Sequence, residues 1–103
     1  MRKGIIYTTD IEKGKQKLEE IIEKKKARGI YHTIIRRSMH NLEVTFSDNT
    51  HWKVAMNFES VRGLRWVDAY IDLDISIRFL NEIIMPKRIR DMNTNEWGEV
   101  HYF

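Results

Sequence analysis

The sequence predicts a small α/β domain, a mixed sheet with two helices and a central antiparallel hairpin, formed as a single domain by residues 1–103. Three observations predict it. A short β-type run near the N-terminus is followed by apolar residues at helical spacing, two alternating runs flank a polar turn, and a later β-type run precedes a second helical pattern. A strand, a helix and a further strand favour a right-handed βαβ unit with a parallel pair, to which the hairpin adds antiparallel pairing.

Length and composition limit the class of protein. The chain of 103 residues is 42% hydrophobic and 11% aromatic, enough for one modest core and too apolar for a disordered chain. Cysteine is absent, which excludes disulfides and thiolate metal sites. No stretch approaches the ~18 uncharged apolar residues of a membrane span, and the first residues turn polar too soon for a signal peptide. We therefore expect a cytoplasmic protein with no membrane partner.

The first two elements follow from local patterns. Residues 4–8 (GIIYT) form a β-type run. Thr9, with Glu12 three positions later, matches a capping box, so we expect Thr9 to be the N-cap of a helix that reaches Arg28, with Gly29 just beyond its end. The apolar stripe of this helix consists of Ile11, Leu18, Ile21 and Ile22.

The middle of the chain predicts strands. Residues 30–37 are rich in β-branched and aromatic side chains, and residues 42–46 and 52–56 alternate apolar and polar positions around a turn at 47–50. The two alternating runs predict a hairpin with one buried face. That face consists of Leu42, Val44, Phe46, Trp52, Val54 and Met56.

The last third predicts a strand, a helix and an ambiguous end. Residues 65–73 alternate, which predicts two opposite faces. One face consists of Val67, Ala69, Ile71 and Leu73, and the other of Trp66, Asp68, Tyr70 and Asp72. Asp74 or Ser76 can cap the following helix, which Pro86 ends. Its apolar positions are Ile77, Phe79, Leu80, Ile83 and Ile84. Residues 97–103 form either an edge strand or an aromatic tail.

The charge of the chain is mildly basic, with 18 Lys and Arg against 15 Asp and Glu, a net charge of +3. Basic residues that converge on one face would bind phosphates. The candidates for contact with nucleic acid or another partner are Lys24, Lys25, Arg62, Arg65, Lys87 and Arg88. The alternative is that cations near the C-terminal ends of helices interact favourably with the helix dipole and keep the chain in solution.

Aromatic residues interleave with several basic ones, as nucleic-acid binding requires. The aromatic candidates are Tyr31, His32, Trp66 and Tyr70, and their basic neighbours are Arg36, Arg37, Arg62 and Arg65. The alternative is that these rings belong to the core.

A segment after the first β-type run has features of a P-loop. The motif G-x-x-x-x-G-K-[ST] cradles phosphates with its backbone and lysine. Gly14 and Lys15 match it, whereas Thr9 replaces the first glycine and Gln16 the hydroxyl residue. Asp72, at the end of a later strand, matches the carboxylate that holds magnesium. The alternative is an ordinary capped helix.

The order of short motifs resembles phage-type P-loop ATPases, the large terminase subunits and their relatives. The resemblance rests on residues 46–50 (FSDNT), 62–65 (RGLR) and 70–72 (YID), and it covers roughly residues 4–86. It implies a trimmed P-loop-like core that binds nucleotide through Gly14, Lys15 and Asp72, with Mg²⁺ only in that case. Leu73 stands where the family has its catalytic glutamate, so hydrolysis would be weak or absent.

Other chemistry has weaker support. The four histidines form no metal-binding pair, and no catalytic residue stands out. A strand that continued through Asp74 would align Asp68, Asp72 and Asp74 as a magnesium site, unless Asp74 caps a helix and Asp72 pairs with an arginine. We therefore predict a small non-enzymatic binding or accessory protein, phage-encoded, without a cofactor, acting through a protein or nucleic-acid partner. The alternative is a nucleotide-binding protein with little or no hydrolysis.

Overall fold

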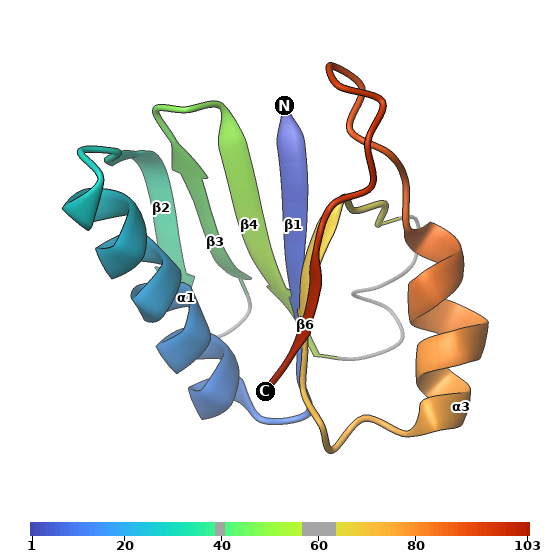
Figure 1. Cartoon of the computed structure of the whole chain (residues 1–103). Helices are drawn as coiled ribbons and strands as arrows, with labels where there is room; N and C mark the ends of the chain where they lie inside the picture. Colours follow the sequence, from blue (N-terminus) through green and yellow to red (C-terminus); the bar gives the residue numbers. More distant parts are fainter. Residues whose placement is uncertain (39–40, 57–63) are drawn as a thin grey trace.

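The computed structural model describes residues 1–38, 41–56 and 64–103 (Figure 1). It is a small mixed α/β domain, as predicted. The strands of the described residues are β1 (Arg2–Tyr7), β2 (His32–Ser38), β3 (Asn41–Phe46), β4 (Thr50–Ala55), β5 (Asp68–Ile71) and β6 (Val100–Tyr102). The helical segments are α1 (Ile11–Ala27) and a continuous stretch made of α3 (Ile77–Phe79), the π-helical η1 (Leu80–Ile84) and the 3₁₀-helical η2 (Met85–Lys87).

All six strands belong to one sheet in the order β2-β3-β4-β1-β5-β6. β1 pairs in parallel with both β4 and β5, and β6 adds in parallel to β5. β2, β3 and β4 are antiparallel neighbours. The expected parallel pairing exists, but β1 pairs with β4 and β5 rather than with β2. The antiparallel β3–β4 hairpin lies between β1 and β2, and α1 crosses this part of the sheet (Figure 1).

The sheet separates two cores, because alternate residues of β1 face opposite sides. Ile6 packs beneath α1 with the hairpin, whereas Ile5 and Tyr7 pack on the side of α3 and η1. The α1-side core is completed by Leu18, Ile21, Ile22, Leu42, Val44, Phe46 and Val54. The resulting arrangement has three layers, helix, sheet and helix.

The ends of α1 lie close to their predicted positions. The N-cap is Asp10 rather than Thr9: the Asp10 side chain accepts a hydrogen bond from the Glu12 N–H at 2.9 Å. An aspartate reaches the free amides of the first turn as well as a threonine does, and the helix therefore begins one residue later than the capping-box pattern suggests. Gly29 follows the C-cap with φ of 75°, as expected for a glycine after a helix end.

The hairpin prediction is confirmed. Val44 lies opposite Trp52, and all six residues predicted for the buried face belong to the α1-side core or pack against it. The last strand is also present: β6 is an edge strand, not an aromatic tail.

The strand predicted over 65–73 is shorter than expected. β5 includes only four residues, because a bend at Val67 precedes it and the chain turns after Ile71. Trp66 was predicted on the face of Asp68 and Tyr70, but the bend carries it into the opposite core, where its Nε1 donates to the Ile84 carbonyl at 3.2 Å. Leu73 was predicted on the face of Val67, Ala69 and Ile71, all three of which are buried, but it is 72% exposed, since it lies beyond the strand.

The second helical stretch is capped by Ser76, whose side chain accepts a hydrogen bond from the Phe79 N–H. Ile77, one of the apolar positions predicted for this helix, is its first residue and is 76% exposed. Pro86 lies inside η2, which ends one residue later. None of the helices in the described ranges has the length and apolar content needed to cross a bilayer.

Candidate functional site

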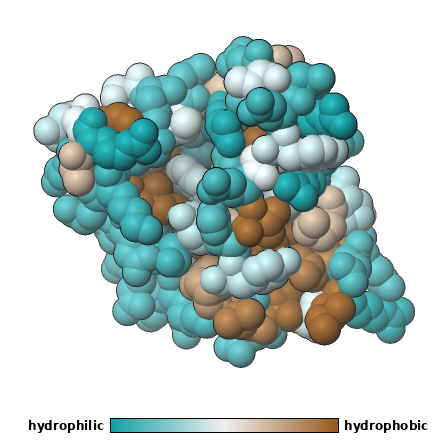
Figure 2. Space-filling model, viewed as in Figure 1, coloured by the Kyte–Doolittle hydropathy of each residue, from teal (hydrophilic) through white to brown (hydrophobic). Residues whose placement is uncertain are grey.

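A cleft of about 580 Å³ opens on the α1 side of the sheet, where the helix covers the hairpin but not β5 and β6. Its floor is the sheet, one wall is the C-terminal half of α1, and the other is the segment that leads into β6. Figure 2 shows this face hollowed between the surface over α1 and the surface over the C-terminal segment. The lining residues that matter below are Gly4, Trp52, Tyr70, Lys24, Arg28, Asp68, Glu96, Trp97 and Glu99.

A row of rings crosses the sheet at the cleft. The Trp52 and Tyr70 ring centroids are 5.4 Å apart, and His101 stacks on Tyr70 at 5.1 Å with an interplanar angle of 25°. Phe103 meets the edge of Tyr70 at 6.5 Å. We call Trp52, Tyr70 and His101 the aromatic row. The three rings come from β4, β5 and β6, so the row spans four strands including β1.

The α1 wall of the cleft is basic. Lys24 and Arg28 are exposed, and in the described part of the chain neither has an ion pair. They are four residues apart, so one turn of helix places them on the same side. Lys25 also lines the cleft, but its ammonium is bound to the Asp48 carboxylate. Lys24 and Arg28 are therefore the cations of this wall that remain open to a ligand.

The opposite wall is acidic and aromatic. Trp97 is 53% exposed, and its ring is contacted by the guanidinium groups of Arg88 and Arg90 at 5.1 and 5.0 Å. Arg88 also donates to the Gly98 carbonyl at 2.8 Å, which fixes this segment against its neighbour. Glu96 and Glu99 flank Trp97 along the chain and line the cleft.

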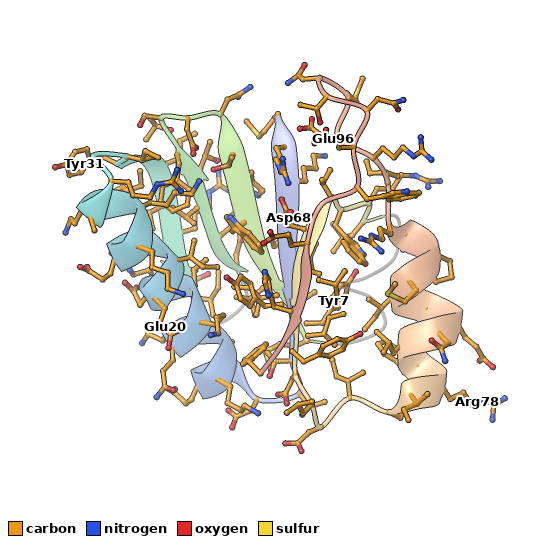
Figure 3. All side chains as sticks on the ribbon, in the orientation of Figure 1. Tyr7, Glu20, Tyr31, Asp68, Arg78 and Glu96 are labelled. Atoms are coloured by element: carbon orange, nitrogen blue, oxygen red, sulfur yellow. The ribbon has the colours of Figure 1, made fainter. Side chains whose placement is uncertain are left out.

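The end of the cleft nearest the start of β1 is held by an ion-pair network. Arg2 donates to both carboxylate oxygens of Asp68, at 2.6 and 2.9 Å, and reaches Asp91 at 3.3 Å. Burial opposes ionisation of Asp68, but the hydrogen bonds from Arg2 and from the Glu99 N–H outweigh it and lower the pKa of this carboxyl. Figure 3 labels Asp68 on the sheet and Glu96 on the segment leading into β6. Because Asp68 and Arg2 neutralise each other, neither adds net charge to the cleft.

The three residues predicted to bind nucleotide are not brought together. Gly14 and Lys15 lie within α1, which begins at Ile11, so residues 9–15 form a capped helix start rather than an open loop. Gly14 is buried, and a Cβ there would lie 2.7 Å from Val54. Lys15 is exposed on the outer surface of the helix, among acidic neighbours such as Glu12 and Glu19.

Asp72 instead binds Lys13 and Thr8. Lys13 Nζ donates to Asp72 Oδ1 at 2.8 Å, and Thr8 Oγ1 donates to Asp72 Oδ2 at 2.7 Å. Burial of this carboxyl opposes ionisation, yet the hydrogen bonds from Lys13, Thr8 and the Asp74 N–H lower its pKa. The cluster lies at the carboxyl ends of β1 and β5, where connections leave the sheet towards opposite faces and α/β proteins often bind ligands. Here, however, the lysine charge is already neutralised within the chain.

The residues predicted to contact a nucleic-acid partner are dispersed. Lys24 and Lys25 line the cleft, and Arg88 supports its far wall through Trp97. Arg65 and Lys87, although described, are not among the lining residues. Arg62, with the rest of the predicted 62–63 motif, lies outside the described residues.

Of the four interleaved aromatic residues, only Tyr70 belongs to the cleft. Trp66 is fully buried on the other side of the sheet, and Tyr31 and His32 are exposed at the far edge, at and beside β2. The alternative of core packing therefore holds for Trp66, which is fully buried, and in part for Tyr70, which packs against the α1-side core.

The three aspartates predicted as a possible magnesium site do not converge, because β5 ends before Asp72. Asp68 binds Arg2, Asp72 binds Lys13, and the Asp74 side chain is 77% exposed. Within the described ranges, no three His, Asp or Glu side chains are grouped as metal ligands. Asp72 pairs with a lysine, where the sequence suggested an arginine.

Sequence reasoning missed Trp52, His101, Trp97 and the two glutamates as site residues. Trp52 was assigned to the hairpin core, and it does pack against that core with one side. The usable signal was Gly4, a glycine within an apolar strand, which often marks the close approach of another group. His101, Glu96 and Glu99 carry no local pattern that identifies a site.

Comparison of the chain with protein-family models, curated proteins and solved structures gave no match.

Proposed function

We propose that this chain is a non-enzymatic binding protein whose partner is single-stranded nucleic acid, held in the cleft between α1 and β6. The observation that carries the proposal is the aromatic row beside two unpaired cations. Bases stack on aromatic rings whatever their identity, and basic groups along the same groove bind the phosphates. Trp52, Tyr70 and His101 supply the rings, and Lys24 and Arg28 supply the charge.

The position of the rings favours a single strand over a duplex. Trp52 and Tyr70 lie on the floor of a cleft with a wall on each side, and His101 extends the row beyond the lining residues by stacking on Tyr70. A base must be unstacked from its neighbours to reach these rings. In a duplex the faces of the bases are covered by the adjacent pairs, whereas a single strand can splay its bases onto a sheet. The groove therefore suits one strand whose backbone follows α1.

The distribution of charge also favours a strand whose backbone follows α1. Lys24 and Arg28 stand on the α1 wall, and Glu96 and Glu99 stand on the opposite wall. Phosphates are attracted to the first wall. On the second, the two carboxylates that line the cleft oppose a phosphate, while Arg88 and Arg90 lie against the Trp97 ring. A protein partner would need matching acidic and basic groups across both walls, whereas one nucleotide strand meets this pattern with its backbone on one side and its bases on the other.

The first test removes the cations. A fluorescein-labelled single-stranded oligonucleotide of about ten nucleotides, titrated with the protein at ~50 mM salt, should give a saturable rise in anisotropy. The double variant Lys24→Ala/Arg28→Ala should bind the oligonucleotide at least about tenfold more weakly than the wild type. The matched control, Lys15→Ala/Lys26→Ala, removes the same charge from positions of α1 that do not line the cleft and should bind nearly as well as the wild type.

The second test removes a ring. His101 is exposed, so His101→Ala should leave the fold intact while weakening binding about tenfold, in line with the loss of one stacked base. His32→Ala, an exposed imidazole on β2, is the control. Equal effects of the two histidine substitutions, or no binding of any oligonucleotide at low salt, would contradict the proposed function.

A nucleotide site at Asp72 is the second candidate. The observation in its favour is the meeting of Thr8, Lys13 and Asp72 at the carboxyl ends of β1 and β5. A nucleotide phosphate would have to displace Asp72 from Lys13. Binding of ATP or GTP that is measurable by calorimetry and lost in Lys13→Ala would favour this candidate over the cleft.

A further inference from the structure

The charged residues that line the two walls of the cleft have opposite signs, and this difference affects which bases the cleft can bind. Resting on the proposed function, we infer that Glu96 and Glu99 contact the edge of the bound base and favour bases that carry an amino group over thymine and uracil. The juxtaposition that carries the inference is the Glu99 carboxylate beside His101 at the end of the aromatic row, with Glu96 on the same wall, across the cleft from Lys24 and Arg28.

The direction of the base follows from the positions of charge. With its phosphates at Lys24 and Arg28, a nucleotide extends its base across the sheet, over Trp52 and Tyr70, towards β6. The edge of the base then points at the wall that carries the glutamates. A base laid the opposite way would place phosphate against two carboxylates, which like-charge repulsion opposes.

Glu99 is held at the end of the aromatic row. Its backbone N–H donates to Asp68 Oδ1 at 2.9 Å, and its Oε2 lies 2.9 Å from His101 Nε2. His101 in turn stacks on Tyr70. One carboxylate oxygen of Glu99 therefore lies against the ring that ends the row, and the other can accept from a donor on a base stacked there, since this side chain is 78% exposed.

Glu96 is the less constrained of the two. Its backbone is fixed, since its carbonyl accepts from the Asp91 N–H at 2.9 Å and its own N–H donates to Thr94. Among the described residues its carboxylate has no ion-pair partner. Asp91 is itself bound to Arg2, so the network under the cleft also fixes the backbone of this wall.

The chemistry of the base edges then sets the preference. A carboxylate is an acceptor only. It can accept from the exocyclic amino group of cytosine or adenine, and from the amino group and the adjacent ring N–H of guanine. Thymine and uracil present a single N–H between two carbonyl oxygens, and those oxygens face the carboxylate without a proton between them. Discrimination arises from this mismatch, because stacking on the row is available to every base.

The test compares two oligonucleotides of equal length and phosphate number, about ten residues of deoxycytidine or of thymidine, at pH 7.5 and ~50 mM salt. The full-length wild-type chain should bind the cytosine strand about five- to tenfold more tightly. In Glu96→Gln/Glu99→Gln, both affinities should rise with the loss of repulsion, and the ratio should fall to about one, since an amide can also donate to thymine. Glu12→Gln/Glu23→Gln, an equal charge change on the outer surface of α1, should leave the ratio unchanged.

The outcomes separate the inference from the proposed function. Equal binding of the two strands by the wild type, or a ratio that survives in the double glutamine variant, overturns the role of the glutamates while leaving single-strand binding in place. Absence of binding to both strands overturns the proposed function itself. A preference for cytosine that disappears only in the glutamine variant confirms both.

Discussion

The indole ring of Trp52 on β4 lies across Gly4 of the neighbouring strand β1. A Cβ atom at Gly4 would come within 2.5 Å of two carbons of that ring, closer than real Cβ contacts allow. The absence of a side chain at Gly4 is therefore what lets the indole lie over β1 and reach Tyr70 on β5. This one glycine makes the aromatic row continuous across the sheet.

Substitution of Gly4 should disturb the row. We expect Gly4→Ala to lower the free energy of unfolding by about 1–3 kcal/mol, because the added methyl overpacks a site filled by Trp52. Urea unfolding followed by circular dichroism measures this change. Lys3→Ala, at an exposed position of the same strand, should stay within about 0.5 kcal/mol of the wild type. Equal stability of the Gly4→Ala and Lys3→Ala variants would show that the indole does not need the glycine.

The salt dependence of binding should report the number of phosphate contacts. Two open cations, Lys24 and Arg28, predict a slope of about −1.4 for log affinity against log salt on single-stranded DNA, at about −0.7 per phosphate. Anisotropy titrations between ~50 and ~200 mM salt measure it. Lys24→Ala/Arg28→Ala should flatten the slope towards zero, while Lys15→Ala/Lys26→Ala should keep it. A slope several times steeper would mean that cations outside the cleft make most of the contacts with phosphates.

The buried carboxylate Asp72 should stabilise the fold in a pH-dependent way. Its pKa is lowered in the folded state, so its contribution is complete above the unfolded pKa of about 3.9 and is lost as the pH falls through the folded value. Asp72→Asn should cost about 1.5–3 kcal/mol at pH 7, as for hydrogen bonds to a charged group. The difference from the wild type should shrink below about pH 4.

Denaturant melts of the Asp72→Asn variant and the wild type at several pH values measure this effect. Asp74→Asn serves as the control, because the Asp74 side chain is 77% exposed and lies 3.9 Å from the same lysine. If the variant is less stable than the wild type by as much at pH 3 as at pH 7, the shape of the Asp72 side chain, rather than its charge, stabilises the fold.

Phe46 should be essential to the α1-side core. It is 2% exposed and packs in the same core as Leu18, Ile22 and Val44, so truncation leaves a cavity under α1. Phe46→Ala should lower the free energy of unfolding by about 3–5 kcal/mol, enough to threaten a domain of this size. Thermal melting with Ile34→Ala as the exposed control on β2 measures it. A melting temperature equal to that of the control would contradict the register of the hairpin.

Local sequence patterns were sufficient to predict the hairpin and α1. The period of two in residues 42–56 set which hairpin residues are buried, since a strand exposes alternate side chains to opposite faces. The helical spacing of Leu18, Ile21 and Ile22 did the same for α1, and Gly29 marked the end of that helix. The class of the fold follows from these signals because each depends on residues close together along the chain.

Departures from prediction occur where a local pattern competes with packing. The alternation over 65–73 was regular in sequence, but a bend at Val67 places Trp66 in the core beneath η1, where its large ring is fully buried. Lys13 rather than Lys15 reaches Asp72, because the helix begins at Ile11 and its rotation decides which lysine faces the sheet.

The sequence by itself determined the class of the fold, the hairpin face and the C-terminal end of α1, because these depend on neighbours a few residues apart. Only the tertiary structure decided the candidate site. Trp52, Tyr70 and His101 come from β4, β5 and β6, and their contact depends on the strand order β4-β1-β5-β6, which no local pattern specifies. Residues separated by up to half of the chain become neighbours only when parallel strands pair, and the free energy of that pairing comes from the two cores rather than from the site.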